Sequence, residues 1–418
     1  MIIPSIDISR GQAVQLVEGE AVAIEAGDPF PLMERFSVAG EVAVIDIDAA
    51  RGQGDNRQLI SELCRRGRVR LGGGIRDLDT ALWWLDQGVS RIIIGTAATP
   101  EFLLSLPRER VIVALDSRDS QVLSHGWRQS TGETLLDRVS ELNQSCDGFL
   151  VTFVEREGRL GGTDLDRAKQ VIDAAGDARV TVAGGISTVE EIAELDRLGA
   201  DAQVGMALYT GDISLADALA APLVSDRADG LWPTVVVDEA GVALGLAWSS
   251  HESLRQAIET KRGAYESRSR GLWIKGETSG AVQELVGVAA DCDRDTLRFT
   301  VRQHGAGFCH TGERTCWGSD HGFGRLQRRI LATGDDPASN TRKLLRDPAL
   351  LAAKIREEAE ELAETEDRAQ VVAEAADLLY FLMVKTAATG VGLDEIEAEL
   401  DRRAKRVTRR PMVAKDAQ

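Results

Sequence analysis

The sequence contains no long apolar run and begins without an export signal. It has no stretch of 18 consecutive apolar residues, which is the shortest run expected of a membrane-spanning helix. Residues 1–4 lack the basic start and the cleavage site of a secretory leader. We therefore expect a cytoplasmic protein with no membrane partner.

Cysteine is scarce, and the five cysteines do not suit a disulfide framework. An odd number spread over 418 residues is a poor basis for pairing. Cys64 and Cys146 stand alone, whereas Cys292, Cys309 and Cys316 lie close together in the sequence. This clustering favours metal ligation.

Basic residues are outnumbered, with 49 Lys and Arg against 67 Asp and Glu and a formal net charge of −18. This balance argues against a nucleic-acid partner held by a basic surface. Phosphate ligands remain compatible with it, because glycine turns, helix N-termini and magnesium bind them locally. The length allows two to four domains.

The part of the sequence that precedes Pro222 alternates short apolar runs with amphipathic stretches. Continuous apolar runs are typical of buried parallel strands, which need helical crossovers between them. The runs cover residues 2–8, 42–48, 69–75, 91–97, 111–116, 148–154, 180–186 and 202–208. Eight such units predict a (β/α)8 TIM barrel. An open doubly wound sheet is the alternative, but it rarely uses so regular a repeat.

The two halves of this region resemble each other. The pairs Gly73-Gly74 and Gly184-Gly185 each follow a predicted strand, at equivalent places in the two halves. Gly95 and Gly205 repeat with almost the same offset, and so do Asp7 and Asp116. Internal duplication of a half-barrel accounts for all of these spacings.

Glycines at strand ends predict two phosphate sites at the mouth of the barrel. Their backbone N–H groups can approach an anion closely, and a following helix N-terminus adds partial positive charge. The two predicted sites consist of Gly73, Gly74, Gly95 and Thr96 on one side, and Gly184, Gly185 and Gly205 on the other. A ligand phosphorylated at both ends would fit them. The alternative is that these glycines only form tight turns.

Two aspartates end the first and fifth predicted strands and should face each other across the barrel. Asp7 and Asp116 could then divide the acid and base roles that opening and enolising an aminosugar require. The alternative is that each aspartate only caps a helix.

These motifs resemble one enzyme family. They are residues 5–8, 72–76, 95–97, 115–127 and 183–186. The family is phosphoribosylformimino-5-aminoimidazole carboxamide ribotide isomerase. The resemblance implies that Asp7 is the base and Asp116 the acid of an Amadori rearrangement. Phe153 and Arg159 depart from the family pattern and motivate an alternative, in which the barrel is a silent scaffold or regulatory module.

The composition changes near residues 221–230. Residues 234–237 and 242–248 predict a hairpin around a turn at 238–241, within a small α+β domain. From Phe323 the pattern is helical, with breaks at 334–337, 347–348 and 390–392 and a frayed tail from residue 402. We therefore predict three domains over 1–224, 230–321 and 322–418, the last all-α.

The segment from residue 291 combines hard and soft metal ligands. If it forms a strand, Asp291, Asp293 and Asp295 share one face and suit magnesium. Cys292 would point to the other face and could form a three-sulfur zinc site with Cys309 and Cys316. Buried structural cysteines and an acidic surface turn are the alternatives.

This segment resembles phosphoribosyl-AMP cyclohydrolase in residues 265–270, 272–280, 291–295 and 309–316. The resemblance implies zinc on the three cysteines, with Cys292 donated across the interface of a homodimer. It also implies magnesium on the three aspartates. Arg268 and Arg270 are candidate phosphate contacts by their charge, or simply surface cations.

Two acidic motifs occupy the predicted C-terminal helices. They consist of Glu357, Glu358 and Glu361 on one helix, and Glu374 and Asp377 on the next. Stacked like charges favour a magnesium ion bound with a polyphosphate, although a solvated acidic face is the alternative.

The acidic motifs resemble those of phosphoribosyl-ATP pyrophosphohydrolase. The three resemblances together imply consecutive steps of histidine biosynthesis, with phosphoribosyl-ATP, phosphoribosyl-AMP and a bis-phosphorylated ribotide as substrates. A more distant alternative is a general nucleotide hydrolase fused to a phosphate-binding barrel.

Overall fold

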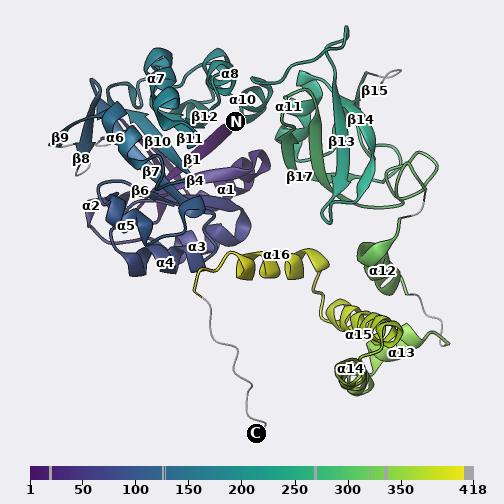
Figure 1. The fold of residues 1–418 in the computed structure, drawn as a ribbon. Coiled ribbons are helices and arrows are strands. Elements are labelled where there is room, and N and C mark those ends of the chain that lie inside the picture. Colours follow the sequence, from purple (N-terminus) through teal and green to yellow (C-terminus); the bar gives the residue numbers. More distant parts are fainter. Residues whose placement is uncertain are drawn as a thin grey trace. The chain divides into compact units, whose positions relative to one another are not determined.

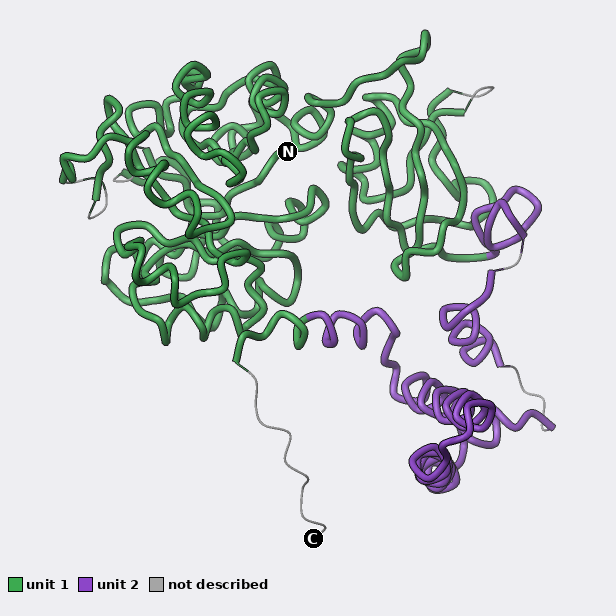
Figure 2. Tube along the Cα trace, viewed as in Figure 1, with its two compact units in different colours: residues 1–305, 402–418 green, residues 306–401 purple. Residues whose placement is uncertain are grey.

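A computed structural model describes residues 1–17, 21–124, 127, 129–267, 271–318, 320–333 and 338–408. The chain forms two compact units (Figure 2). Unit 1 comprises residues 1–305 and the segment from Arg402 onward, and unit 2 comprises residues 306–401. Unit 2 begins inside the predicted middle domain, so the predicted domain boundaries remain predictions.

Eight parallel strands close into a barrel in unit 1, which confirms the predicted TIM barrel (Figure 1). The strands are β1 (Ile2–Ser9), β4 (Glu41–Asp46), β5 (Arg68–Gly72), β6 (Arg91–Ile94), β7 (Val111–Arg118), β10 (Gly148–Phe153), β11 (Arg179–Ala183) and β12 (Ala200–Val204). Each overlaps one predicted apolar run. The ring closes where β7 pairs with β10, with Asp116 opposite Thr152.

Helices follow the strands, and those that precede β12 lie in the crossovers between parallel strands. They are α1 (Pro29–Phe36), α2 (Ile47–Arg51), α3 (Arg57–Arg66), α4 (Leu78–Asp86), α5 (Pro100–Leu104), α6 (Leu135–Leu142), α7 (Leu165–Ala175), α8 (Val189–Arg197), α9 (Met206–Thr210) and α10 (Leu215–Ala220), with short 3-10 turns η1 (Ser37–Ala39), η2 (Arg108–Arg110) and η3 (Val154–Arg156). Local capping explains where they start. Asp77 caps α4, and Thr188 forms a capping box with Glu191 at α8.

Two antiparallel extensions follow the first and fifth barrel strands. β2 (Gln12–Val17) and β3 (Ala21–Gly27) continue from β1, and β8 (Gln121–Ser124) and β9 (Gln129–Thr134) continue from β7. The sequence pattern did not predict these strands. Their presence in both halves agrees with the internal duplication.

A second sheet of six strands forms the rest of unit 1 up to residue 305. Its strands are β13 (Trp232–Asp238), β14 (Ala243–Ser249), β15 (Ala264–Ser267), β16 (Gly271–Ile274), β17 (Gln283–Ala290) and β18 (Leu297–Gln303), and its helix is α11 (His251–Thr260). β13 and β14 form the predicted hairpin. Tyr265 and Phe299 are fully buried in its core, with their ring centroids 5.6 Å apart.

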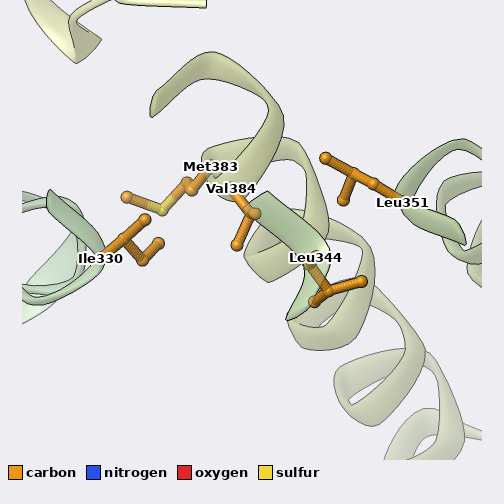
Figure 3. Packing of buried hydrophobic residues seen from close by; sticks show 5 residues of the cluster. All are labelled: Ile330, Leu344, Leu351, Met383 and Val384. Carbon is orange, nitrogen blue, oxygen red and sulfur yellow. The ribbon is translucent and has the colours of Figure 1, made fainter. Parts of the chain in front are cut away.

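Unit 2 is helical, as predicted. Its helices are α12 (Gly322–Leu331), α13 (Asn340–Arg346), α14 (Pro348–Glu364), α15 (Arg368–Ala388) and α16 (Leu393–Ala404), which runs into unit 1. Its buried core consists of Ile330, Leu344, Leu351, Met383 and Val384 (Figure 3). Among the described helices, none is long and apolar enough to cross a membrane.

The predicted helix breaks at 347–348 and 390–392 are confirmed, and the break at 334–337 lies outside the described residues. The prediction that fraying starts at residue 402 was wrong. α16 continues to Ala404, and the amides of Val407 and Thr408 then donate to Asp86 Oδ1 at 2.9 and 3.1 Å. A carboxylate at the end of α4 therefore holds this segment.

A buried ionic cluster closes the amino-terminal end of the barrel. Glu41 accepts hydrogen bonds from Arg70 Nε at 2.8 Å, from Arg91 Nη1 at 3.2 Å and from the Ser90 hydroxyl. The side chains of Glu41 and Arg70 are 7% and 4% exposed. Burial would raise the pKa of Glu41, but Arg70, Ser90 and Arg91 outweigh it and lower that pKa.

Replacing Glu41 with alanine should destabilise the barrel by about 3–5 kcal/mol, because Arg70 would remain buried without a counter-charge. Urea unfolding at pH 7 measures this loss. Since the folded pKa is depressed, the wild-type contribution is present above the unfolded pKa and is lost as the pH falls through the folded value. Glu252→Ala, which breaks an exposed pair with Arg255, is the control and should cost much less. Equal losses in the two variants would contradict this account.

Candidate functional site

The closed barrel brings the two predicted catalytic aspartates to one rim. Asp7 lies near the carboxyl end of β1, and Asp116 lies near that of β7. These strands are the first and fifth of eight in a closed ring, so the two residues face each other across the mouth.

Burial makes these carboxyl groups unusually hard to ionise. It raises the pKa of Asp7 to about 7. It also raises the pKa of Asp116, although hydrogen bonds from Trp127 and Thr152 oppose the shift. Asp7 is therefore suited to exchange a proton near neutral pH, as a general base must.

A third acid, Glu157, joins the pair and was not among the predicted site residues. Burial and then the charges of Asp7 and Asp116 raise its pKa to about 8. A Cβ placed on Gly184 would lie 3.3 Å from Glu157 Oε2, so the carboxylate sits against the second glycine pair. Its place just after the sixth predicted strand was the available signal, since all eight carboxyl ends meet at this rim.

The glycine pairs occupy tight turns after β5 and β11. Gly73, Gly74, Gly184 and Gly185 have φ values of 101°, 72°, 94° and 82°. A Cβ on Gly73 would lie 2.2 Å from the Asp46 carbonyl oxygen, and one on Gly184 would lie 2.7 Å from that of Phe153. The need for a tight turn therefore explains glycine at these positions without any ligand.

Ring order places the two predicted phosphate sites opposite each other. Gly95 and Thr96 follow β6, the neighbour of β5, and Gly205 follows β12, the neighbour of β11. A cavity of about 40 Å³ adjoins the second set and is lined by Ser5, Glu157, Gly184, Gly185, Gln203 and Gly205. Gly205 begins α9 without a side-chain cap. This arrangement leaves the first amides of α9 without a side-chain acceptor from the capping residue.

The predicted strand through the aspartate cluster was wrong. Residues 291–296 form a turn between β17 and β18, and Arg294 has a φ of 66°. Asp291 Oδ1 accepts from the amides of Asp295 and Thr296, both at 3.1 Å, which bends the chain back. The turn still gathers the predicted ligands, since carboxylate oxygens of Asp291, Asp293 and Asp295 lie within 4.8 Å of one another.

Two of the three predicted zinc ligands lie together. Cys309 and Cys316 are in hydrogen-bond contact in unit 2, and Cys292 lies in the aspartate turn of unit 1. Thr311 Oγ1 donates to Cys309 Sγ at 3.1 Å. Hydrogen bonds from Thr311, and then from Cys316, lower the pKa of Cys309 and favour the thiolate that binds metals. The predicted phosphate contacts Arg268 and Arg270 lie outside the described residues.

The acidic helices bring part of their predicted set together. Carboxylate oxygens of Glu358, Glu374 and Asp377 lie within 4.8 Å of one another. Burial, then a hydrogen bond with Glu361 and the neighbouring carboxylates, raises the pKa of Glu374. Glu357 is instead paired with Lys354, 2.8 Å from its ammonium nitrogen. Crowded carboxylates of this kind suit a hard divalent cation.

Comparison with known proteins agrees with this architecture. A family model described as histidine biosynthesis protein matches residues 1–214, just over half of the chain. A phosphoribosyl imidazole-4-carboxamide isomerase of Methanopyrus kandleri is 35% identical over 228 residues, which are 51% of this chain and 94% of that protein. The chain belongs to the histidine biosynthesis protein family.

Two further family models match the rest of this family member in the predicted order. They are phosphoribosyl-AMP cyclohydrolase over residues 245–318 and phosphoribosyl-ATP pyrophosphohydrolase over residues 323–404. The predicted resemblances of all three segments are thereby confirmed.

Fungal relatives span more than one of these segments. The histidine biosynthesis trifunctional protein of Komagataella pastoris is 35% identical over 353 residues, 81% of this chain and 38% of that protein. The histidine biosynthesis bifunctional protein his7 of Schizosaccharomyces pombe is 45% identical over 207 residues, 49% of this chain and 50% of that protein. The chain thus covers half or less of these fungal proteins.

The cysteines should react with iodoacetamide at pH 7.5 in a fixed order, because only the thiolate is nucleophilic. Cys309 should be alkylated well before Cys64 and Cys146, whose pKa values burial raises to about 12 and about 11. Peptide mass spectrometry over time measures the order. Thr311→Val, which removes the hydroxyl donor, should slow Cys309 alone. Equal rates at Cys309 and Cys64 would contradict the assignment.

Neutralising Asp7 should stabilise the fold at high pH. Folding raises the pKa of Asp7 from 3.8 to about 7. The destabilising charge of the buried carboxylate is therefore absent below about pH 4 and fully present above about pH 7. Asp7→Asn should therefore gain at least about 1 kcal/mol over wild type at pH 8 and much less at pH 4.5. Urea unfolding at both pH values measures this gain. Asp173→Asn, at an exposed position on α7, should show no such pH-dependent gain.

Proposed function

We propose that the chain carries out three steps of histidine biosynthesis in the cytoplasm. The C-terminal helices hydrolyse phosphoribosyl-ATP to phosphoribosyl-AMP and pyrophosphate, and the middle segment opens the purine ring. The barrel isomerises the resulting bis-phosphorylated ribotide. The observation that carries the proposal is the rim where Asp7 and Asp116 face each other between two opposite glycine sites. The matched order of the three family models supports it.

In the barrel, a ligand with two phosphates spans the mouth. Gly73, Gly74, Gly95 and Thr96 bind one phosphate through backbone amides, and Gly184, Gly185 and Gly205 bind the other. This places the sugar between the carboxyl groups. Asp116, whose pKa burial raises, donates a proton to open the ring, and Asp7 removes the carbon-bound proton to complete the Amadori rearrangement.

In the middle segment, Cys309 and Cys316 would hold zinc with Cys292 of the partner subunit, so the active form is a homodimer. Zinc held there would lower the pKa of a water molecule to about 7 and so would supply a nucleophile for attack on the purine. The thiolate-favouring contacts of Cys309 fit this ligand role. Asp291, Asp293 and Asp295 would hold magnesium, and Arg268 and Arg270 would contact phosphate.

In the C-terminal helices, five acidic residues would hold magnesium and through it the triphosphate. They are Glu357, Glu358, Glu361, Glu374 and Asp377. The raised pKa of Glu374 fits a site where carboxylates repel one another until a cation is bound. Glu357 would exchange its contact with Lys354 for the metal.

A silent barrel is the second candidate, because Phe153 and Arg159 depart from the isomerase pattern. The structure weakens the argument from Phe153. Phe153 is fully buried, and the Arg167 guanidinium lies 5.0 Å from its ring, so Phe153 belongs to the packing between barrel and helices. The departure at this position therefore changes the core and not the groups that would face a ligand.

Asp7→Asn should lower the isomerisation rate at least about 1000-fold, because the base is lost while its shape is kept. Full-length protein receives phosphoribosyl-ATP with magnesium and zinc, and products are identified by chromatography and mass. Both hydrolytic steps should continue, so the unisomerised ribotide accumulates. Asp173→Asn is the control, and this variant should carry out all three steps. Unchanged isomerisation in Asp7→Asn would favour the silent barrel, and no product from wild type would refute the proposal.

A further inference from the structure

The aspartate turn carries an arginine whose carboxylate partner lies outside the turn. Arg294 sits between Asp293 and Asp295 in the sequence, yet its guanidinium binds the barrel. Nε lies 3.0 Å from Asp196 Oδ2 and Nη2 lies 2.8 Å from Asp196 Oδ1. Two-point pairing of this kind fixes both the position and the plane of the guanidinium.

Further hydrogen bonds hold the same arginine. Its Nη1 donates to the carbonyl oxygen of Asp291 at 2.8 Å, and its own carbonyl accepts from the amide of Val224 at 2.9 Å. The φ of 66° at Arg294 is uncommon for a residue other than glycine. These contacts compensate for that conformation and orient the side chain toward α8.

Asp196 is itself fixed in the last turn of α8. Its Oδ1 lies 2.8 Å from the terminal amine of Met1, which also lies 2.9 Å from Asp201 Oδ1. The Asp196 and Arg294 side chains are 13% and 22% exposed, so water screens their pairing only weakly. The amine keeps Asp201 as a second partner if Asp196 is removed.

We propose that Asp196 is a positioning residue for the magnesium site, because it holds the Arg294 cation away from Asp291, Asp293 and Asp295. This inference rests on the proposed magnesium role of that turn. A guanidinium is the strongest carboxylate partner among side chains, and Arg294 is adjacent in sequence to two of the three carboxylates. Without Asp196, Arg294 turns back and competes with the divalent ion. The barrel thereby sets the metal affinity of the neighbouring segment.

The test is calorimetric titration of the full chain with Mg²⁺ alone. Wild type should show two classes of site, and Asp293→Asn should abolish the class that belongs to the turn. Asp196→Ala should weaken that class roughly tenfold, as the loss of a supporting contact to a metal site does. The class that belongs to the acidic helices should not change. Glu190→Ala, at an exposed position in the first turn of α8, should leave both classes unchanged.

A double variant tests whether Asp196 acts by holding the Arg294 cation away from the site or only by supporting the structure. Asp196→Ala combined with Arg294→Gln removes the competing charge and should restore wild-type affinity within about threefold. Affinity as weak as in Asp196→Ala alone would overturn the proposal, as would unchanged affinity in Asp196→Ala. If Asp293→Asn removes no class of site, the magnesium role itself fails, and the inference fails with it. Urea unfolding of each variant monitors folding independently.

Discussion

The structure depends first on the parallel closure of the barrel where β7 meets β10. Closure gathers the carboxyl ends of all eight strands at one rim, so residues far apart in the chain become neighbours. Asp7 and Asp116 face each other for this reason alone. The same geometry shields them from bulk water, and the resulting desolvation raises the pKa of both carboxyl groups, that of Asp7 to about 7. Barrel closure therefore determines both the fold and the acid–base properties of the two aspartates.

Carboxylates in this acidic chain are accommodated in different ways at different places. The amino end of the barrel neutralises Glu41 with two arginines. At the rim, burial keeps Asp7 and Glu157 protonated over a wider pH range. In the aspartate turn and between α14 and α15, three carboxylates crowd together in a way that suits a divalent ion. Net charge alone could not distinguish these cases.

Much of this architecture could be predicted from the sequence because it follows from periodicity and from motifs local in the chain. Eight apolar runs gave eight strands, and the repeated glycines and aspartates indicated the rim. Asp291, Asp293 and Asp295 were grouped correctly for the wrong reason. Strand alternation was expected, whereas the backbone amides of Asp295 and Thr296 donate to the Asp291 carboxylate and bend the segment into a turn.

Features that depend on tertiary contacts could not be predicted. Burial, and then the charges of Asp7 and Asp116 on other strands, raise the pKa of Glu157, and both causes arise only in the folded barrel. β3 and β9 are largely exposed and pair only with β2 and β8, outside the barrel, so no alternation with a buried face marks them in the sequence. Asp86 binds residues 407–408, which lie at the far end of the sequence.

Titration of the Asp7 carboxyl group tests the central claim most directly. Infrared spectra of protein labelled with 13C-aspartate, taken from pH 4 to 9 and compared with Asp7→Asn, isolate its protonated carbonyl band. The account predicts a midpoint near pH 7, because the closed barrel desolvates the rim. A midpoint near pH 4 would mean that water reaches the carboxylate freely, and it would contradict the account.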